Sequence, residues 1–148
     1  MPFIHPDRRM AGGGTMADYR DELSSLHSAG IRAVVSLLNI PSDAAVFESA
    51  GFDFRCLPIP DGGAPTFAQA DEFIQFVSQQ HASGQAVAVH CEAGLGRTGT
   101  MLALFLISTG DGARSAIAKI RAVERSAVET TRQIDFLEKY AIRCENNS

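Results

Sequence analysis

The segment 86–107, with the sequence AVAVHCEAGLGRTGTMLALFLI, constrains the fold more than any other part of the chain. A short apolar run comes first, then a cysteine with a glycine-rich stretch, then a second and longer apolar run. The first run is typical of a buried strand, and the second is long enough to be a helix. We therefore predict a strand over 86–90, a tight loop, and a helix over 97–109.

The rest of the chain also alternates between strand and helix patterns. Helices are predicted over 15–29, 43–50, 66–81, 112–123 and 130–142, and strands over 32–38 and 53–59. Thr15 is the expected N-cap of the first helix and Gly30 its end, and Asp111 is the expected N-cap of the helix over 112–123. This alternation indicates an α/β fold. We expect a single domain over 1–148, with a short, mostly parallel central sheet and helices on both faces.

Charge and hydropathy narrow the range of partners. The formal net charge is −4, whereas broad electrostatic binding to nucleic acid or to anionic membranes needs a basic surface. The longest apolar run, Met101 to Ile107, is far too short to span a bilayer. The first residues also lack the apolar core of a secretion signal. We expect a cytoplasmic protein with neither a nucleic-acid nor a membrane partner.

The cysteines and histidines do not suggest a disulfide or a metal site. The three cysteines, Cys56, Cys91 and Cys144, lie far apart, and an odd number fits a reduced protein better than a disulfide framework. The four histidines have no ligand-like spacing to them. We therefore expect no metal and no other cofactor. Cys56 and Cys144 are interpreted as small core residues rather than as redox partners of Cys91.

The glycines of the segment permit several interpretations. Gly94, Gly96 and Gly99 spell G-x-G-x-x-G, which is a dinucleotide-binding pattern when a second strand follows the helix. Here another helix is predicted instead, so that interpretation is weak. A phosphate-binding loop of the G-x-x-x-x-G-K-[ST] type is excluded because the stretch contains no lysine.

A phosphate-binding cup with a nucleophile at its base explains more of these residues. A loop that curls before a helix points successive backbone N–H groups into one concavity, and the helix N-terminus adds partial positive charge. Glycine permits the positive φ angles of such a loop. Arg97 could hold two phosphate oxygens at once, and Cys91 would be stabilised there as a thiolate. The residues expected to bind the phosphate are Glu92, Ala93, Gly94, Leu95, Gly96 and Arg97.

The stretch His90 to Gly99, H-C-x-x-G-x-x-R-T-G, resembles the signature of the cysteine-dependent protein tyrosine phosphatases. The resemblance is closest to the small atypical dual-specificity phosphatases, and it extends to IRAVVSLL, LPIPDGGAP and SAVETTRQ elsewhere in the chain. It implies the phosphatase fold of that family and hydrolysis through a cysteinyl-phosphate intermediate, without a metal. It also implies that phosphate, sulfate or vanadate can occupy the loop.

The resemblance completes the set of candidate catalytic residues. The leaving oxygen needs a proton, and Asp61 in the turn PIPDGGAPT is the candidate general acid. An aspartate that caps its own turn is the simpler alternative. In similar enzymes the hydroxyl at Thr98 stabilises the leaving thiolate, and His90 supports the loop. Gln133 matches a residue that orients the hydrolytic water, and Glu129 orients either that water or Arg97; both could instead be exposed polar residues.

The expected substrates are phosphotyrosine and phosphoserine or phosphothreonine in proteins or peptides. No aromatic recognition loop is evident to deepen the pocket for phosphotyrosine alone. Glu92 and Leu95 stand where related lipid phosphatases place lysines, which disfavours polyanionic headgroups. A phosphatase of small phosphorylated metabolites, a slow or non-hydrolysing phosphate-binding module, and a sulfur-transfer enzyme are the alternatives. Phe67, Phe73, Phe76 and Phe105 are expected to lie in the core rather than to contact substrate.

Overall fold

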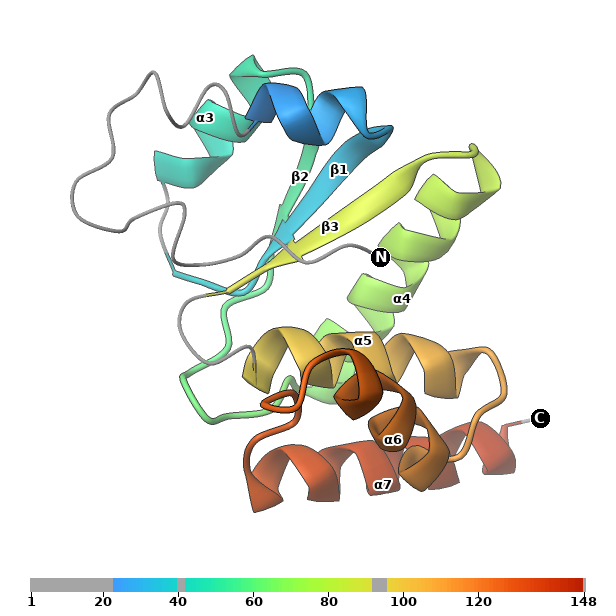
Figure 1. Cartoon of the computed structure of the whole chain (residues 1–148). Helices are drawn as coiled ribbons and strands as arrows, with labels where there is room; N and C mark the ends of the chain where they lie inside the picture. The colour runs from blue at the N-terminus through green and yellow to red at the C-terminus, as the bar shows by residue number, and fades with distance from the viewer. Residues whose placement is uncertain (1–22, 40–41, 92–95, 148) are drawn as a thin grey trace. The chain divides into compact units, whose positions relative to one another are not determined.

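The structure is a computed structural model that describes residues 23–39, 42–91 and 96–147 (Figure 1). Its elements follow the predicted alternation of strands and helices. In chain order they are β1 (Ile31–Ser36), α3 (Ser42–Ser49), β2 (Asp53–Cys56), α4 (Phe67–Ala82), β3 (Ala86–His90), α5 (Gly96–Ser108), α6 (Ala113–Val123) and α7 (Thr131–Asn146). The predicted cap Thr15 lies outside the described residues. The described end of its helix, 23–28, is helical, and Gly30 follows with φ 88°.

The sheet is parallel, as the sequence predicts. Its strand order is β2-β1-β3, and β1 pairs in parallel with both neighbours. β2 ends at Cys56 rather than at residue 59 as predicted. The prolines at 58 and 60 explain the difference, because proline has no N–H to donate to a strand ladder. The apolar residues at 57 and 59 therefore belong to a buried connection and not to a longer strand.

The chain divides into two compact units, each with its own packing. The first contains the sheet, α3 and the second half of α4. Its buried cluster joins β1, β2, β3 and α3, and it consists of Leu23, Ile31, Val34, Phe47, Phe52, Phe54 and Ala88. The ring of Phe47 stacks on that of Phe54, with centroids 5.3 Å apart. Helix α3 thereby covers this apolar face of the sheet.

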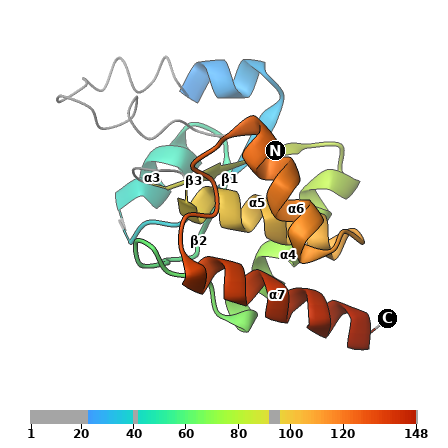
Figure 2. The same cartoon turned by 60° about the horizontal axis from the view of Figure 1, so that its bottom comes forward.

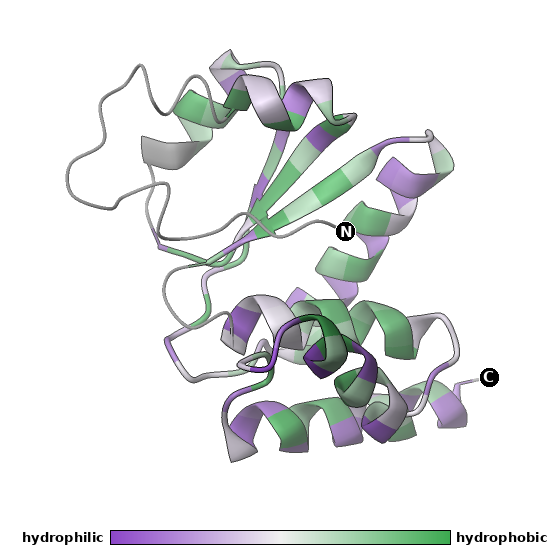
Figure 3. Ribbon diagram, viewed as in Figure 1, coloured by the Kyte–Doolittle hydropathy of each residue, from purple (hydrophilic) through white to green (hydrophobic). Residues whose placement is uncertain are grey.

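The second unit contains Ile59–Ile74 and the helices α5, α6 and α7. These three helices pack against one another, as Figure 2 shows. Helix α5 is the most apolar of them, and its C-terminal part is the green stretch in Figure 3. Helices α6 and α7 alternate between polar and apolar residues, which is the pattern of helices with one face in the core.

The ends of the last two helices differ from the prediction. The N-cap of α6 is Gly112, without a side-chain cap, whereas the Asp111 carboxylate accepts a hydrogen bond from Lys119 at 2.9 Å. The prediction of Asp111 as a cap is therefore wrong, because a lysine two turns into α6 binds its carboxylate. Helix α7 continues to Asn146, four residues beyond its predicted end. No helix among residues 23–39, 42–91 and 96–147 combines the length and apolar character needed to cross a bilayer.

Candidate active site

Cys91 and Arg97 lie at the two ends of the segment that the sequence singles out. Cys91 directly follows β3 and is completely buried, and Arg97 lies in the first turn of α5. The intervening Glu92, Ala93, Gly94 and Leu95, expected to bind phosphate, lie outside the described residues. The structure thus confirms that a strand precedes the cysteine and that a helix contains the arginine; the helix begins at Gly96, one residue before its predicted start.

The guanidinium of Arg97 lies among groups that offset the cost of burying its charge. The residue is only 8% exposed, and its Nη1 donates a hydrogen bond of 2.9 Å to the carbonyl of Ile59. Its Nη2 lies 3.9 Å from Oδ1 of Asp61, whose side chain is 79% exposed. A buried cation needs such partners, because desolvation otherwise destabilises it. The fold thus brings the predicted phosphate-binding arginine close to the predicted general acid.

The turn that carries Asp61 is tight and depends on glycine. The N–H of Gly63 donates to the carbonyl of Pro60 at 2.8 Å, which closes a four-residue turn. Gly62, at the third position, has a φ of 74°, a conformation that glycine adopts without steric cost. In the described part of the chain no backbone N–H binds the Asp61 carboxylate. The turn thus presents this carboxylate to solvent on one side and to Arg97 on the other.

Two side chains from the start of α7 hold the turn from behind. The hydroxyl of Thr130 donates to the carbonyl of Gly62 at 2.8 Å, and Nε2 of Gln133 donates to the carbonyl of Gly63 at 3.1 Å. The two contacts join residues 68 and 70 positions apart, and sequence patterns carry no signal for them. They make the position of Asp61 depend directly on the N-terminus of α7.

Gln133 is completely buried, so the alternative of an exposed polar residue is wrong for it. Its Oε1 accepts hydrogen bonds from the N–H groups of Glu129 (2.7 Å) and Thr130 (3.0 Å). The Thr130 hydroxyl in turn accepts from the Gln133 N–H at 3.2 Å, which completes a capping box. Glu129 itself is exposed. Gln133 therefore both caps α7 and supports the Asp61 turn.

Gly96 and Gly99 allow the segment 127–129 to approach α5 closely. A Cβ on Gly96 would lie 2.6 Å from Oε2 of Glu129, and one on Gly99 would lie 2.4 Å from the Cβ of Ala127. Both glycines belong to α5, so their role here is close packing and not the positive φ that the sequence suggested. Arg121, which sequence reasoning missed, donates to the carbonyls of Ala127 and Val128 and fixes this segment.

The other residues singled out in the sequence, two beside the cysteine–arginine motif and two further cysteines, differ in burial. His90 and Thr98 are buried, with 1% and 0% of their surface exposed. The carbonyl of His90 accepts a hydrogen bond from the Leu37 N–H at 2.8 Å, which continues the sheet. Cys56 is exposed, so its prediction as a core residue is wrong; its thiol donates to the carbonyl of Leu38 instead. Cys144 is half-buried.

The phenylalanines divide into two groups. Phe73 and Phe76 are buried, as predicted, and Phe105 is half-buried. Phe67 is 40% exposed, and its prediction as a core residue is wrong because it begins α4 at the surface. Within the described residues, no three His, Cys, Asp or Glu side chains form a cluster that could hold a metal ion.

Comparison with known proteins identifies the family. A family described as "Polymorphic toxin system, DSP-PTPase phosphatase" matches residues 10–111. The protein tyrosine phosphatase PRL-1 of Leishmania major is 32% identical over 130 residues, which cover 82% of this chain and 74% of that protein. The human protein tyrosine phosphatase type IVA 3 is 33% identical over 120 residues, which cover 80% of this chain and 69% of that protein.

Solved structures agree with the sequence relatives. Tk-PTP in its active form is 30% identical with a TM-score of 0.77, and the match covers 84% of this chain and 86% of that one. The structure of PTPMT1 in complex with PI(5)P superimposes with a TM-score of 0.79 at 23% identity, which supports the fold alone. The chain belongs to the DSP-PTPase family of cysteine-based tyrosine and dual-specificity phosphatases. It is accordingly a phosphatase with the α/β fold of that family.

Proposed function

We propose that the protein hydrolyses phosphotyrosine and phosphoserine or phosphothreonine esters of proteins through a cysteinyl-phosphate intermediate. The observation that carries this proposal is the approach of Asp61 to within 3.9 Å of Arg97, which is itself held by the Ile59 carbonyl. A phosphate bound by the arginine would lie beside a carboxyl group exposed enough to reach a leaving oxygen. The relatives named as protein tyrosine and dual-specificity phosphatases support the same substrates.

In the first step, the Cys91 thiolate attacks the phosphorus atom and a sulfur–phosphorus bond forms. The ester oxygen leaves with the electrons of the broken phosphorus–oxygen bond, and Asp61 gives it a proton. Arg97 and the backbone N–H groups of residues 92–96 bind the remaining phosphate oxygens, where negative charge spreads in the transition state. General acid catalysis of this kind contributes about 10²–10⁴-fold to the rate.

In the second step, the ionised Asp61 takes a proton from water, and the water oxygen attacks the cysteinyl phosphate. Phosphate leaves, and the thiolate of Cys91 returns, stabilised by the hydroxyl of Thr98. We assign Gln133 to orienting the water and Glu129 to orienting that water or Arg97. His90 supports the loop. We also propose a cytoplasmic location, because a catalytic thiol and an odd number of cysteines suit a reducing compartment.

The test is hydrolysis of a small aryl phosphate from pH 4 to 9 in the presence of a metal chelator. We expect activity in the wild type, none in Cys91→Ser, and a reduced rate in Asp61→Ala. The Asp61→Ala profile should also lose its decline at high pH, because that decline reflects loss of the acid's proton. Wild-type activity in Cys91→Ser would refute the thiolate mechanism. Tight binding of vanadate without any turnover would indicate a phosphate-binding module instead.

A further inference from the structure

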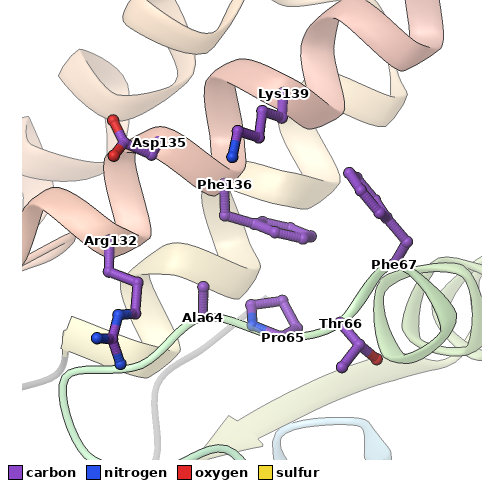
Figure 4. A pocket seen from close by; sticks show the side chains of 8 residues that line it. All are labelled: Ala64, Pro65, Thr66, Phe67, Arg132, Asp135, Phe136 and Lys139. Atoms are coloured by element: carbon purple, nitrogen blue, oxygen red, sulfur yellow. The ribbon is translucent and has the colours of Figure 1, made fainter.

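A cavity of about 750 Å³ opens beside the Asp61 turn, within the second unit (Figure 4). Its floor is the stretch 64–66 that follows the turn, one wall is Phe67 at the start of α4, and the other wall is the first half of α7. Cavities of a few hundred to about 1,000 Å³ are the size of ordinary ligand sites. The proposed mechanism gives this space no role.

The lining of the cavity includes an exposed aromatic ring, that of Phe67, and a mostly buried one, that of Phe136. The rings of Phe67 and Phe136 lie side by side in its lining, with centroids 5.2 Å apart and planes tilted by 36° (Figure 4). Phe67 is 40% exposed, although it is a large apolar side chain at the beginning of a helix. Pro65 adds a third apolar group to the same space. An apolar side chain of a ligand would therefore bury surface here that is now exposed to water.

The charged side chains at the rim of the cavity are two cations, Arg132 and Lys139, and one carboxylate, Asp135. Arg132 and Lys139 line the cavity, and within the described residues neither forms a hydrogen bond or an ion pair. Asp135 is the one carboxylate of the lining, and in Figure 4 it points away from the two rings. Two available cations beside one carboxylate favour an anionic ligand.

Arg143 is a nearby cation that, unlike Arg132 and Lys139, already has a carboxylate partner. Its guanidinium forms two hydrogen bonds of 2.9 Å to the Asp71 carboxylate and lies 5.0 Å from the centre of the Phe67 ring. The hydrogen bond to Asp71 raises the pKa of Arg143 above its ordinary value. Arg143 is thus already neutralised, whereas the cations of the cavity rim are not.

The cavity is connected by a short stretch of chain to the groups proposed to bind phosphate. Six residues lead from Ile59, which holds Arg97, to Pro65 in the cavity floor, so the two lie at most about 20 Å apart. Gln133, which supports the Asp61 turn, directly follows Arg132 on α7. A substrate peptide with its phosphate at Arg97 would therefore reach the cavity within about six residues.

We propose that this cavity binds a segment of the substrate protein that carries acidic residues and one apolar side chain close to the phosphorylated residue. The inference rests on the proposed function, because it places the phosphorylated residue at Arg97. The apolar side chain packs against the exposed ring of Phe67 beside Pro65, and the acidic residues pair with Arg132 and Lys139. The cavity thereby selects among phosphoproteins, while the phosphate loop selects only for phosphate.

The experiment measures peptide binding to the Cys91→Ser protein by fluorescence anisotropy. One phosphotyrosine peptide carries two aspartates and a leucine within six residues of the phosphate, and its matched control carries serines there. We expect the acidic peptide to bind about tenfold more tightly, with a difference that declines as salt increases. The double substitution Arg132→Glu with Lys139→Glu should abolish the difference, and Phe67→Ala should reduce it.

Arg114→Glu provides the matched charge reversal, because Arg114 is exposed on α6 and does not line this cavity. It should leave the preference intact. Equal binding of the two peptides, or a preference that survives the double substitution, would overturn the inference. Tighter binding of phosphoinositide vesicles than of both peptides, lost in the double substitution, would also overturn it.

Wild-type hydrolysis of the same two peptides, with an aryl phosphate as reference, separates this inference from the proposed function. Turnover without any preference for the acidic peptide would refute the cavity's role and leave the phosphatase mechanism standing. Binding of the acidic peptide that is lost in the double substitution, without turnover of any ester, would refute the phosphatase mechanism and leave the cavity's role standing.

Discussion

Strand β1 and the turn that carries Asp61 are held in place in different ways. β1 lies between two parallel neighbours, and its residues Ala33, Val34 and Val35 are completely buried. The turn and the residue before it are held by three side chains that donate to backbone carbonyls: Arg97 of α5, Thr130 at the N-cap of α7, and Gln133 of α7. The strand depends on many equivalent contacts, while the turn depends on a few individual ones.

This difference implies that the two regions respond differently to substitution. Loss of one apolar contact in the sheet should lower the free energy of unfolding and leave the chemistry of folded molecules unchanged. Loss of one contact at the turn should alter the rate more than the stability, because small displacements of a catalytic group are costly. Four substitutions, taken from the largest expected effect to the smallest, test this contrast.

Asp61→Asn should have the largest effect on the reaction. We expect kcat to decrease by about 10²–10⁴-fold, because the amide cannot protonate the leaving oxygen. The melting temperature should change little, since the side chain is 79% exposed. Asp111→Asn is the matched control: Asp111 also pairs with a cation, Lys119, but its loss should not affect kcat. Equal activity of Asp61→Asn and wild type would remove Asp61 from the mechanism.

Phe47→Ala should have the largest effect on stability. The side chain is 1% exposed and packs on Phe54 and Phe52, so its removal should lower the free energy of unfolding by about 3–5 kcal/mol. Urea denaturation gives this value, and active-site titration gives the rate per folded molecule. A decrease in that rate comparable to the one in Asp61→Asn would contradict the contrast between the two regions.

Gly99→Ala should have an intermediate effect. The new methyl group would lie 2.4 Å from the Cβ of Ala127 and 2.8 Å from its Cα, so backbone must move. We expect a loss of about 1–3 kcal/mol in the free energy of unfolding. Gly112→Ala is the control, because its methyl group meets nothing within 4 Å and its φ is −75°. Equal stability of the two variants would show that the approach of segment 127–129 is not tight.

Thr130→Ala should have the smallest effect on stability. Thr66→Ala is its matched partner, because Thr66 forms the same reciprocal cap with Gln69 at the start of α4. Each variant should lose about 1 kcal/mol. Only Thr130 also holds the carbonyl of Gly62, so only Thr130→Ala should lower kcat for an aryl phosphate, by about tenfold. Similar kcat values in both variants would mean that this contact does not position Asp61.

The sheet and the helices could be predicted from the sequence because their signals are local. The apolar run AVAVH and the glycines at 30 and 84 mark a strand and two turns within a few residues. One prediction failed because a residue outside the local pattern decided it. Asp111 does not cap α6 because Lys119 binds its carboxylate.

The candidate site could be predicted only in part, for the same reason. Cys91 and Arg97 belong to one short motif, and the structure confirms the strand and the helix on either side of it. The contacts of Gln133 and Thr130 with the Asp61 turn join residues 70 and 68 positions apart, and no local pattern encodes them. The cavity beside Phe67 likewise exists only because α7 folds back onto the start of α4.

The most direct test of the account is to trap the intermediate. Wild-type protein is mixed with an aryl phosphate, quenched under denaturing conditions within one turnover, and its peptides are analysed by mass spectrometry. We predict a phosphoryl group on Cys91, present in the wild type and absent in Cys91→Ser, with Cys56 and Cys144 unmodified in both. Turnover that leaves Cys91 unmodified at every time point, or a phosphoryl group on another residue, would contradict the central claim.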